Sequence, residues 1–389
     1  MHTYFRVTLV LLHLVAGLCV TGGASASEPV RIGVTLGLTG KYKAPAEMQQ
    51  RGYEVWEKEV NKRGGILGRP VKLIVIDDQS DSENAKKIYK DLITQQRVDL
   101  LFGPYSSQIA AAVAPIIEEH GYPTLLPGAA ADRIWKQGYK NIFGLFIPAS
   151  KYALEMLRLA VLHDLRRVAI IYADDEFSVE VGNGARRWSR RADREVVLFE
   201  EFKKGTRDLQ SLAEKAKQAR AELVIVGGHF DEAIDMRRAL KSIGWYPRAY
   251  FATIGPTLQK YGDVLVRDAE FTFASSLWEP DENLEFPGSQ DFINTFEQTY
   301  QIMPSYHAAN AYAAGQVIEA AITDAGELDR GKIGQALKNL DIHVAIGRFR
   351  VDRFGVPIKH RPLIIQWLGG KKVIIYPEEH RGVARPVFR

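Results

Sequence analysis

Residues 100–132 carry a strand, loop, helix, strand and loop pattern that limits the fold more than any other stretch of the chain. Two short apolar runs, Leu100–Phe102 and Pro123–Leu126, each end in turn-forming residues, and residues 107–117 between them repeat small and apolar side chains at helical spacing. Two parallel strands joined by a helix deliver their loops to the same edge of a sheet. In open α/β sheets this edge is where ligands bind.

The two loops supply the first candidate binding residues. Ser106 and Ser107 stand at the predicted start of the helix, where either hydroxyl could cap it and leave backbone N–H groups free for a carboxylate or phosphate. Gly128, Ala129 and Ala130 form the second loop, whose small side chains would let a ligand reach the backbone. Ordinary turn chemistry explains two such loops equally well when they are taken alone.

The N-terminal residues have the pattern of a secretory signal. Arg6 is followed by the apolar residues 7–20 and by Ala24-Ser25-Ala26, which has the small-residue spacing of a cleavage site. We therefore expect residues 1–26 to be a signal peptide and the mature protein to be exported to the periplasm. Leu18 disfavours a lipid anchor on Cys19, because a small residue usually precedes a lipidated cysteine.

Composition narrows the functional class. Removing the predicted signal also removes the only cysteine and one arginine, so the net charge falls from +4 to +3 and no disulfide is expected. The charge is spread through both halves and does not indicate nucleic-acid binding. The nine histidines lack zinc-site spacing, so neither a metal nor a cofactor is expected. With 46% hydrophobic residues, the chain is long enough for two cored domains.

Strand and helix patterns alternate along the mature chain. Strand patterns at 30–37 and 71–76, with helices after Pro45 and at 82–96, lead into residues 100–132 and predict a β-α-β-α-β-α-β unit with right-handed crossovers. The same alternation begins again near residue 152 and continues to residue 252, which predicts a second unit of the same kind.

The remaining C-terminal segments predict how the two units are connected. Three helical segments have no strands of their own, so we expect them to return to the first unit: 292–300, 308–325 and 333–340. Strand patterns at 363–367 and 373–375 would complete the second unit. The predicted fold class is α/β, with two doubly wound Rossmann-like lobes joined by three hinge crossings. Lobe 1 would comprise 27–147 and 278–360, and lobe 2 would comprise 148–277 and 361–389.

Three segments in this order resemble the type I periplasmic solute-binding proteins of ABC transporters, in the branch similar to Leu/Ile/Val-binding proteins. They are RIGVTLGLTG, NKRGGILGRPVKLIVIDDQSD and FGPYSSQIAAAVAPIIEEHGYPTLLPGAA. Weaker similarity covers essentially the whole mature chain. The resemblance implies two lobes that close on one small-molecule ligand and deliver it to a membrane ABC permease.

The resemblance also implies roles for particular residues. By position, Ser107 would hold a ligand carboxylate, Gly128 and Ala130 would offer backbone groups, and Phe177 and His229 would contact the ligand from lobe 2. Amino-acid binders usually place a hydroxyl at the position of Ala130 and a carboxylate near Ile254, and this chain has neither. A buried ammonium without a compensating carboxylate costs several kcal/mol. We therefore expect a small carboxylate without an α-ammonium.

Aromatic residues suggest the shape of that ligand. Tyr42, Tyr105, Phe146 and Phe177 could reach the cleft and would suit a flat or apolar acid. Core packing explains any one of them equally well, except that it explains Phe177 less well, because that residue is expected in a loop after a strand. A sensory ligand-binding module of the same fold, coupled to a receptor, stays an alternative to transport. We expect a monomer and no enzyme: Ser107, His229 and Asp174 could be drawn as a hydrolase triad, but no G-x-S-x-G motif surrounds any serine.

Overall fold

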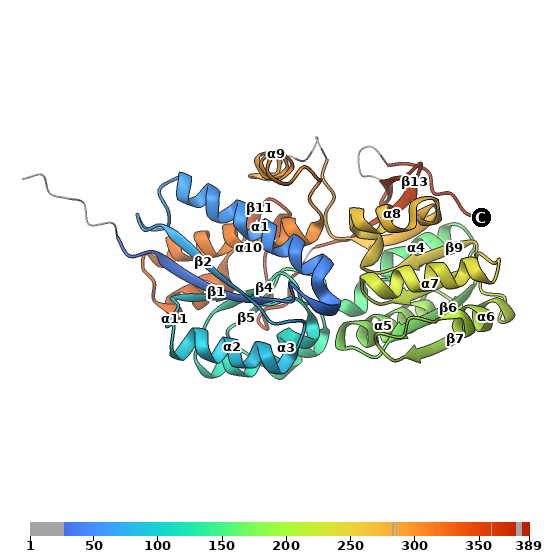
Figure 1. Cartoon of the computed structure of the whole chain (residues 1–389), viewed down its shortest axis with the longest axis horizontal. Helices are drawn as coiled ribbons and strands as arrows, with labels where there is room; N and C mark the ends of the chain where they lie inside the picture. Colours follow the sequence, from blue (N-terminus) through green and yellow to red (C-terminus); the bar gives the residue numbers. More distant parts are fainter. Residues whose placement is uncertain (1–26, 282–283, 285, 359, 379–382) are drawn as a thin grey trace, which may run out of the picture.

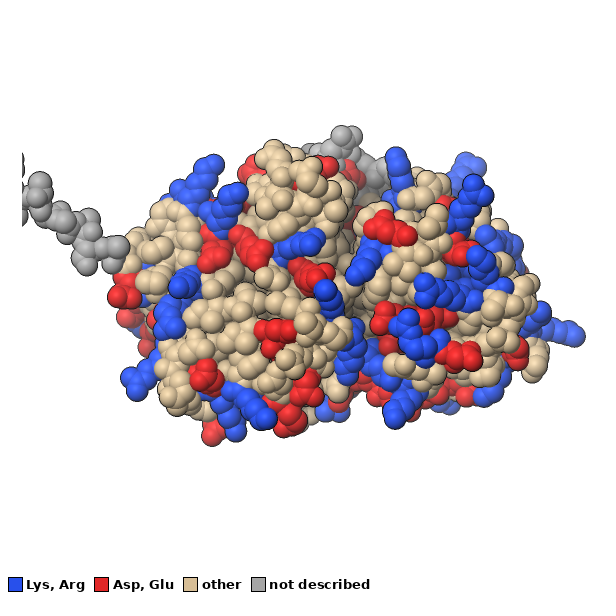
Figure 2. All heavy atoms as spheres, viewed as in Figure 1, with Lys and Arg blue, Asp and Glu red and all other residues tan. Residues whose placement is uncertain are grey.

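The computed structural model describes residues 27–281, 284, 286–358, 360–378 and 383–389, so the expected signal peptide lies outside the described residues. Figure 1 shows two lobes side by side, each with its own sheet and its own helices. Within the described ranges, no helix is both long enough and apolar enough to cross a bilayer. On the face shown in Figure 2, basic and acidic side chains are interspersed over both lobes, without a broad area of one sign.

Lobe 1 is built around a five-stranded parallel sheet in the order β2-β1-β3-β4-β5. Its strands are β1 (Val30–Leu36), β2 (Val71–Asp77), β3 (Leu100–Phe102), β4 (Thr124–Leu126) and β5 (Ile142–Gly144). The helices α1 (Lys43–Lys62), α2 (Ser82–Thr94) and α3 (Ser107–Glu119) connect successive strands. Parallel neighbours need such crossovers, which explains the short helix-spaced segments seen in the sequence.

Lobe 2 repeats this plan in a seven-stranded sheet of order β14-β13-β10-β9-β8-β6-β7. Its parallel strands are β6 (Arg167–Ala173), β7 (Glu195–Phe202), β8 (Leu223–Gly227), β9 (Ala249–Ala252) and β10 (Thr272–Ser276). β13 (Leu363–Leu368) and β14 (Lys371–Tyr376) extend one edge as antiparallel strands. The helices of this lobe are α4 (Leu154–Leu162), α5 (Glu176–Arg191), α6 (Gln210–Gln218), α7 (Phe230–Ser242) and α8 (Gln259–Leu265).

Between β10 and β13 the chain returns to lobe 1, as the sequence predicted. The returning elements are α9 (Ser289–Tyr300), α10 (Tyr306–Ala325), α11 (Arg330–Asn339) and the hairpin of β11 (Ile342–Val344) with β12 (Gly347–Phe349). Helix α10 packs closely on α1, because an added Cβ at Gly52 would lie only 2.0 Å from the carbonyl oxygen of Ala308. The chain thus passes between the lobes three times: before α4, after β10 and before β13.

The five parallel strands of each lobe follow the same order. In lobe 1 the order reverses between β1 and β3, and in lobe 2 it reverses between β6 and β8. Ligands of open α/β sheets bind beyond the carboxyl ends of the strands at such a point. The predicted fold class is confirmed, while β10, α8 and the β11–β12 hairpin are elements that the sequence patterns had not indicated.

Candidate functional site

Lobe 1 contributes residues that follow the two strands at its reversal point. Tyr42 ends a short 3-10 helix (Gly40–Tyr42) after β1, and Tyr105 and Ser106 lie between β3 and α3. The returning helix α10 begins beside them, because the His307 ring centroid lies 5.6 Å from that of Tyr105. Strand ends and a helix start therefore meet at one place on lobe 1.

Lobe 2 presents the matching loops. Asp175 and Phe177 follow β6, with Asp175 as the N-cap of α5, and His229 follows β8 as the N-cap of α7. The lobes touch directly where the Tyr105 hydroxyl lies 3.3 Å from His229 Nδ1. The Tyr42 ring also packs against the His229 ring, with centroids 5.1 Å apart. The residues after both reversal points thus face each other.

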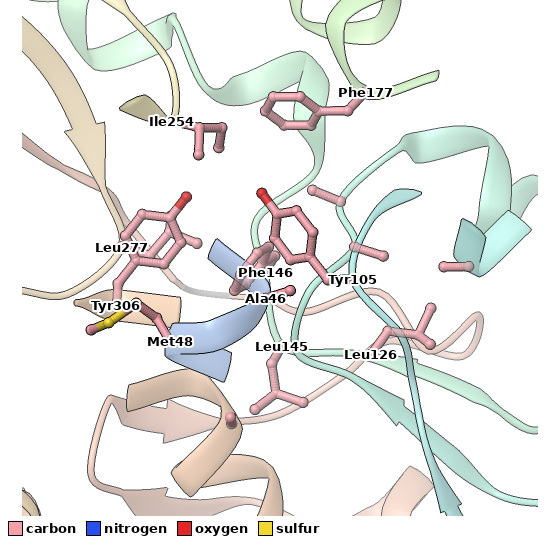
Figure 3. Packing of buried hydrophobic residues seen from close by; sticks show 14 of the residues in the cluster. Ala46, Met48, Tyr105, Leu126, Leu145, Phe146, Phe177, Ile254, Leu277 and Tyr306 are labelled. Carbon is pink, nitrogen blue, oxygen red and sulfur yellow. The ribbon is translucent and has the colours of Figure 1, made fainter. Parts of the chain in front are cut away.

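Ring contacts link eight side chains from both lobes, which we call the cage: Tyr42, Tyr105, Phe146, Tyr152, Phe177, His229, Tyr306 and His307. Phe177 bridges His229 and Tyr152, with centroid distances of 5.3 and 4.9 Å. Figure 3 shows the hydroxyls of Tyr105 and Tyr306 directed toward Ile254 and Phe177. No cage residue is more than 3% exposed, so the lobes are closed over it.

A charged network lies on the lobe 2 side of the cage. Lys204 Nζ lies 3.2 Å from Asp175 Oδ2 and 3.1 Å from Glu232 Oε1, and its side chain is only 9% exposed. His229 Nε2 lies 3.3 Å from Asp175 Oδ1, and the His229 backbone N–H donates to Glu232 Oε2 at 2.9 Å. Both carboxylates of this network therefore already have positively polarised partners.

Electrostatics keeps these carboxylates ionised. Burial alone would raise the pKa of Asp175, but His229 and Lys204 outweigh it and hold that pKa well below its usual range. Glu232 follows the same balance, with burial opposed mainly by Lys204, and its pKa is also lowered. Lys204 is shared by both carboxylates, and each has one further partner within the protein: the His229 ring for Asp175 and the His229 backbone N–H for Glu232.

Ser107 ties the two loops of lobe 1 together. Its Oγ accepts hydrogen bonds from the backbone N–H groups of Ala130 at 2.9 Å and Ala131 at 3.0 Å. The hydroxyl keeps one proton that it can donate. The predicted backbone role of Ala130 needs correction, because its N–H is used by Ser107 and its carbonyl oxygen accepts from Ala149 N.

Helices α3 and α10 begin at the cage without a side-chain cap. Ser106 and Ser305 are the N-cap residues, neither makes a capping hydrogen bond, and neither helix has an acidic residue in its first turn. Both hydroxyls are buried and make no hydrogen bond of good geometry to a described residue, although the Tyr42 hydroxyl lies near that of Ser106. Helices α5 and α7 differ, because Asp175 and Glu232 already occupy their N-termini.

The other predicted site residues lie partly where the sequence suggested and partly elsewhere. Phe177 lies in the first turn of α5 and not in a loop. Gly128 faces protein, since an added Cβ would lie 2.3 Å from Gln49 Oε1, so its small size serves packing there. Ala129 is buried beside it. Phe146 and Ile254 are buried at the cage as the sequence suggested.

The suggested hydrolase triad does not assemble. Asp174 is exposed and accepts a bond from Lys204 N, whereas its neighbour Asp175 is the residue that contacts His229. The Ser107 hydroxyl is bonded to backbone amides and makes no hydrogen bond to His229. Nothing in this arrangement activates Ser107 as a nucleophile.

Several residues of the site were missed by sequence reasoning: Tyr152, Asp175, Lys204, Glu232, Tyr306 and His307. Each lies on a segment whose secondary structure was predicted or is adjacent to one, but their meeting depends on lobe closure. One signal was available in the sequence. The polar residues of SYHAAN stand at the start of the small-residue helix that was predicted at 308–325 and expected to return to lobe 1.

Comparison with known proteins agrees with this geometry. Residues 29–370 match the family described as periplasmic binding protein. The chain belongs to the periplasmic binding protein family. It is 26% identical to Leu/Ile/Val-binding protein homolog 7 of Brucella melitensis, over 95% of this chain and 96% of that protein. A leucine-, isoleucine-, valine-, threonine- and alanine-binding protein of Pseudomonas aeruginosa is 24% identical over 89% and 92% of the two chains.

Solved structures of this family share the fold. A leucine-binding protein of Thermotoga maritima superimposes with a TM-score of 0.82 at 21% identity and covers 89% of this chain and 97% of its own. A solute-binding protein of R. palustris, solved in complex with benzoate, gives a TM-score of 0.80 at 20% identity and covers 92% and 97%. The predicted membership in the type I, Leu/Ile/Val-binding-like branch is confirmed.

Proposed function

We propose that this chain is the extracytoplasmic solute-binding component of an ABC importer. Its lobes close on a small carboxylate at the cage, and the closed protein delivers that ligand to a membrane permease. The matched relatives are named for amino acids that carry a carboxylate, and one matched structure holds benzoate. Membership in the periplasmic binding protein family supports a binding role.

The observation that carries the proposal is the pair of uncapped helix starts in lobe 1. A helix N-terminus presents free N–H groups and a partial positive charge, both of which favour an anion. Ser106 and Ser305 add two buried hydroxyls without partners, and buried hydroxyls without partners are costly. A ligand carboxylate bound beside Ser106 would accept a hydrogen bond from the Ser106 hydroxyl. The hydroxyl of the adjacent Ser107 also keeps a proton that it could donate to the ligand.

The lobe 2 network argues against an α-ammonium on the ligand. An ammonium buried at the cage would need a carboxylate that is not already neutralised. Asp175 and Glu232 share Lys204, and Asp175 also contacts His229, so both are committed. Ile254, an apolar residue of lobe 2, also faces the cage. We therefore favour an amine-free acid with an apolar or aromatic body.

A thermal-shift panel tests this function. Leucine, its keto-acid counterpart, benzoate and phenylacetate would each be added to the purified mature protein. A ligand present at about a hundred times its dissociation constant stabilises the protein by roughly 2.7 kcal/mol, which such a panel detects. We expect at least one amine-free acid to raise the melting temperature more than leucine does. Stabilisation by leucine alone would refute the amine-free assignment, and no response to any acid would refute the carboxylate.

Matched variants locate the binding site. Ser106→Ala should weaken binding of the responding acid roughly ten- to a hundredfold, since a hydrogen bond to a charged group contributes about 1.5 to 3 kcal/mol. Ser189→Ala is the control, because its hydroxyl is equally buried and without a partner but lies near the opposite end of α5. Equal affinities for the two variants would place the carboxylate elsewhere.

A further inference from the structure

His307 is a buried imidazole whose two ring nitrogens have no protein partner among the described residues. It is the second residue of α10, its side chain is 1% exposed, and neither Nδ1 nor Nε2 is hydrogen-bonded. Burial, helped by the nearby charges of His229 and Lys372, lowers its pKa to about 3. At neutral pH the ring is therefore uncharged and carries one N–H donor and one lone-pair acceptor.

The neighbours of His307 do not use either nitrogen. Tyr306 stacks on the ring with centroids 4.0 Å apart, and Tyr105 and Phe146 contact it at 5.6 and 6.3 Å. The Tyr105 hydroxyl is engaged with His229. The hydroxyls of Tyr152 and Tyr306 are likewise buried; they lie near each other, but neither makes a hydrogen bond of good geometry to another described residue. Unmatched donors and acceptors therefore line the same part of the cage.

A buried polar group without a hydrogen-bond partner lowers the stability of the folded protein. A buried donor or acceptor without a partner costs about 1 to 3 kcal/mol, so buried polar side chains in folded proteins nearly always bond to something. Here that partner must come from outside the chain, as an ordered water or as an atom of the ligand. The charge of the ring decides which ligand atom would fit.

We propose that His307 determines the specificity of the cage by binding an uncharged hydroxyl or carbonyl group of the ligand. The preferred ligand is then a small acid that carries a second, neutral polar group. This inference rests on the proposed function, because it assumes that an acid binds between the lobes. A neutral ring offers no positive charge to a second carboxylate and no negative charge to an ammonium. A hydroxyl matches it best, since it can donate to one nitrogen or accept from the other.

The position of His307 supports this assignment. It contacts Tyr105, which immediately precedes Ser106, so the ring lies on the same wall as the uncapped start of α3. A ligand held by its carboxylate at α3 would extend its body past the rings of Phe146 and Tyr306. The far polar group would then lie among the hydroxyls of Tyr152 and Tyr306 and the ring of His307.

Calorimetric titration with matched acids tests the inference. The pairs are benzoate with 4-hydroxybenzoate, benzoate with 3-hydroxybenzoate, and 4-methylpentanoate with its 2-hydroxy derivative. We expect the wild-type protein to bind the hydroxylated member of at least one pair roughly ten- to a hundredfold more tightly. His307→Phe keeps an aromatic ring without either nitrogen and should bring this affinity ratio close to one. His307→Asn, which retains a donor and an acceptor, should restore part of the ratio.

The outcomes separate this inference from the proposed function. His343→Phe is the control, because that histidine is exposed on β11 and should leave the ratio unchanged. If no acid binds, the proposed function fails. If acids bind but no pair shows a preference, or if His307→Phe lowers both members of a pair equally, the inference is overturned: water occupies the ring nitrogens or the ring is structural, and the proposed function still stands.

Discussion

Removing Lys204 should show how much its ion pairs with Asp175 and Glu232 contribute to the stability of the protein. Its Nζ bridges Asp175 and Glu232 at 3.2 and 3.1 Å, which places the two carboxylate oxygens at most about 6 Å apart. With an effective dielectric constant of about 20, two negative charges at that separation repel by about 3 kcal/mol. Breaking a buried ion pair by removing one partner typically costs about 3 to 5 kcal/mol. We therefore expect Lys204→Met to lower the free energy of unfolding by about 3 kcal/mol or more at pH 7.5.

The pH dependence of that loss identifies its cause. In the wild-type protein the pKa values of Asp175 and Glu232 are lowered, so their stabilising contribution is complete above the unfolded-state pKa values near 4. It is lost as the pH falls through the lower folded-state values. Without Lys204 the folded-state pKa values rise, and protonation relieves the repulsion. The deficit of the variant should therefore be smaller at pH 4.5 than at pH 7.5.

Urea unfolding followed by circular dichroism at both pH values measures these differences. Lys215→Met is the matched control: Lys215 pairs with Glu200 at 3.0 Å, but the two side chains are 49% and 35% exposed. Such a surface pair contributes about 1 kcal/mol or less. The argument is refuted if the two lysine variants lose the same stability at pH 7.5, or if the Lys204 deficit does not change between the two pH values.

Two further predictions concern lobe 1. Asp78 is fully buried just after β2, and burial raises its pKa to about 6, so the stability of the wild-type protein should fall as the pH rises from 4 to 6. Asp78→Asn should remove this fall and should be more stable than the wild-type protein above pH 6 by up to about 3 kcal/mol. Urea unfolding across this pH range measures both effects. Gly52→Ala should destabilise the protein by about 1 to 3 kcal/mol through its clash with Ala308. Gly334 lies in α11, and an added Cβ there would be 3.6 Å from its nearest neighbour, Pro123, so Gly334→Ala should stabilise the protein by about 0.5 to 1 kcal/mol in the same assay. Equal effects of the two glycine substitutions, or a flat pH profile of the wild-type protein, would contradict these expectations.

The sequence predicted the architecture because local patterns determine it. Alternating apolar runs and helical spacings defined β1 to β9, and the absence of strands among residues 289–339 correctly returned those helices to lobe 1. β10 was missed because Thr272–Ser276 combines two serines and a threonine with two apolar residues and lacks a strong period. Its burial comes from β9 and β13 on either side, which are distant in sequence from each other.

The site was only partly predictable, because its chemistry arises between segments. Ser106 and Tyr105 were named from their places after strands and His229 from the family resemblance, and the structure brings all three to the cage. Their partners could not be assigned from the sequence: Lys204 reaches Asp175 and Glu232 from a different loop. His307 lies just before the helix predicted at 308–325, and only its lack of hydrogen-bond partners among the described residues distinguishes it.

The near-complete burial of the cage has a kinetic consequence. With no cage residue more than 3% exposed, a molecule held there could neither enter nor leave while the Tyr105–His229 contact joins the lobes. Dissociation must then wait for the lobes to separate, so the residence time of every ligand includes the same opening step. If lobe 1 captures a ligand before lobe 2 closes, the observed association rate should level off at the closing rate when ligand is abundant. A permease that favours the open form would accelerate release without touching the ligand itself.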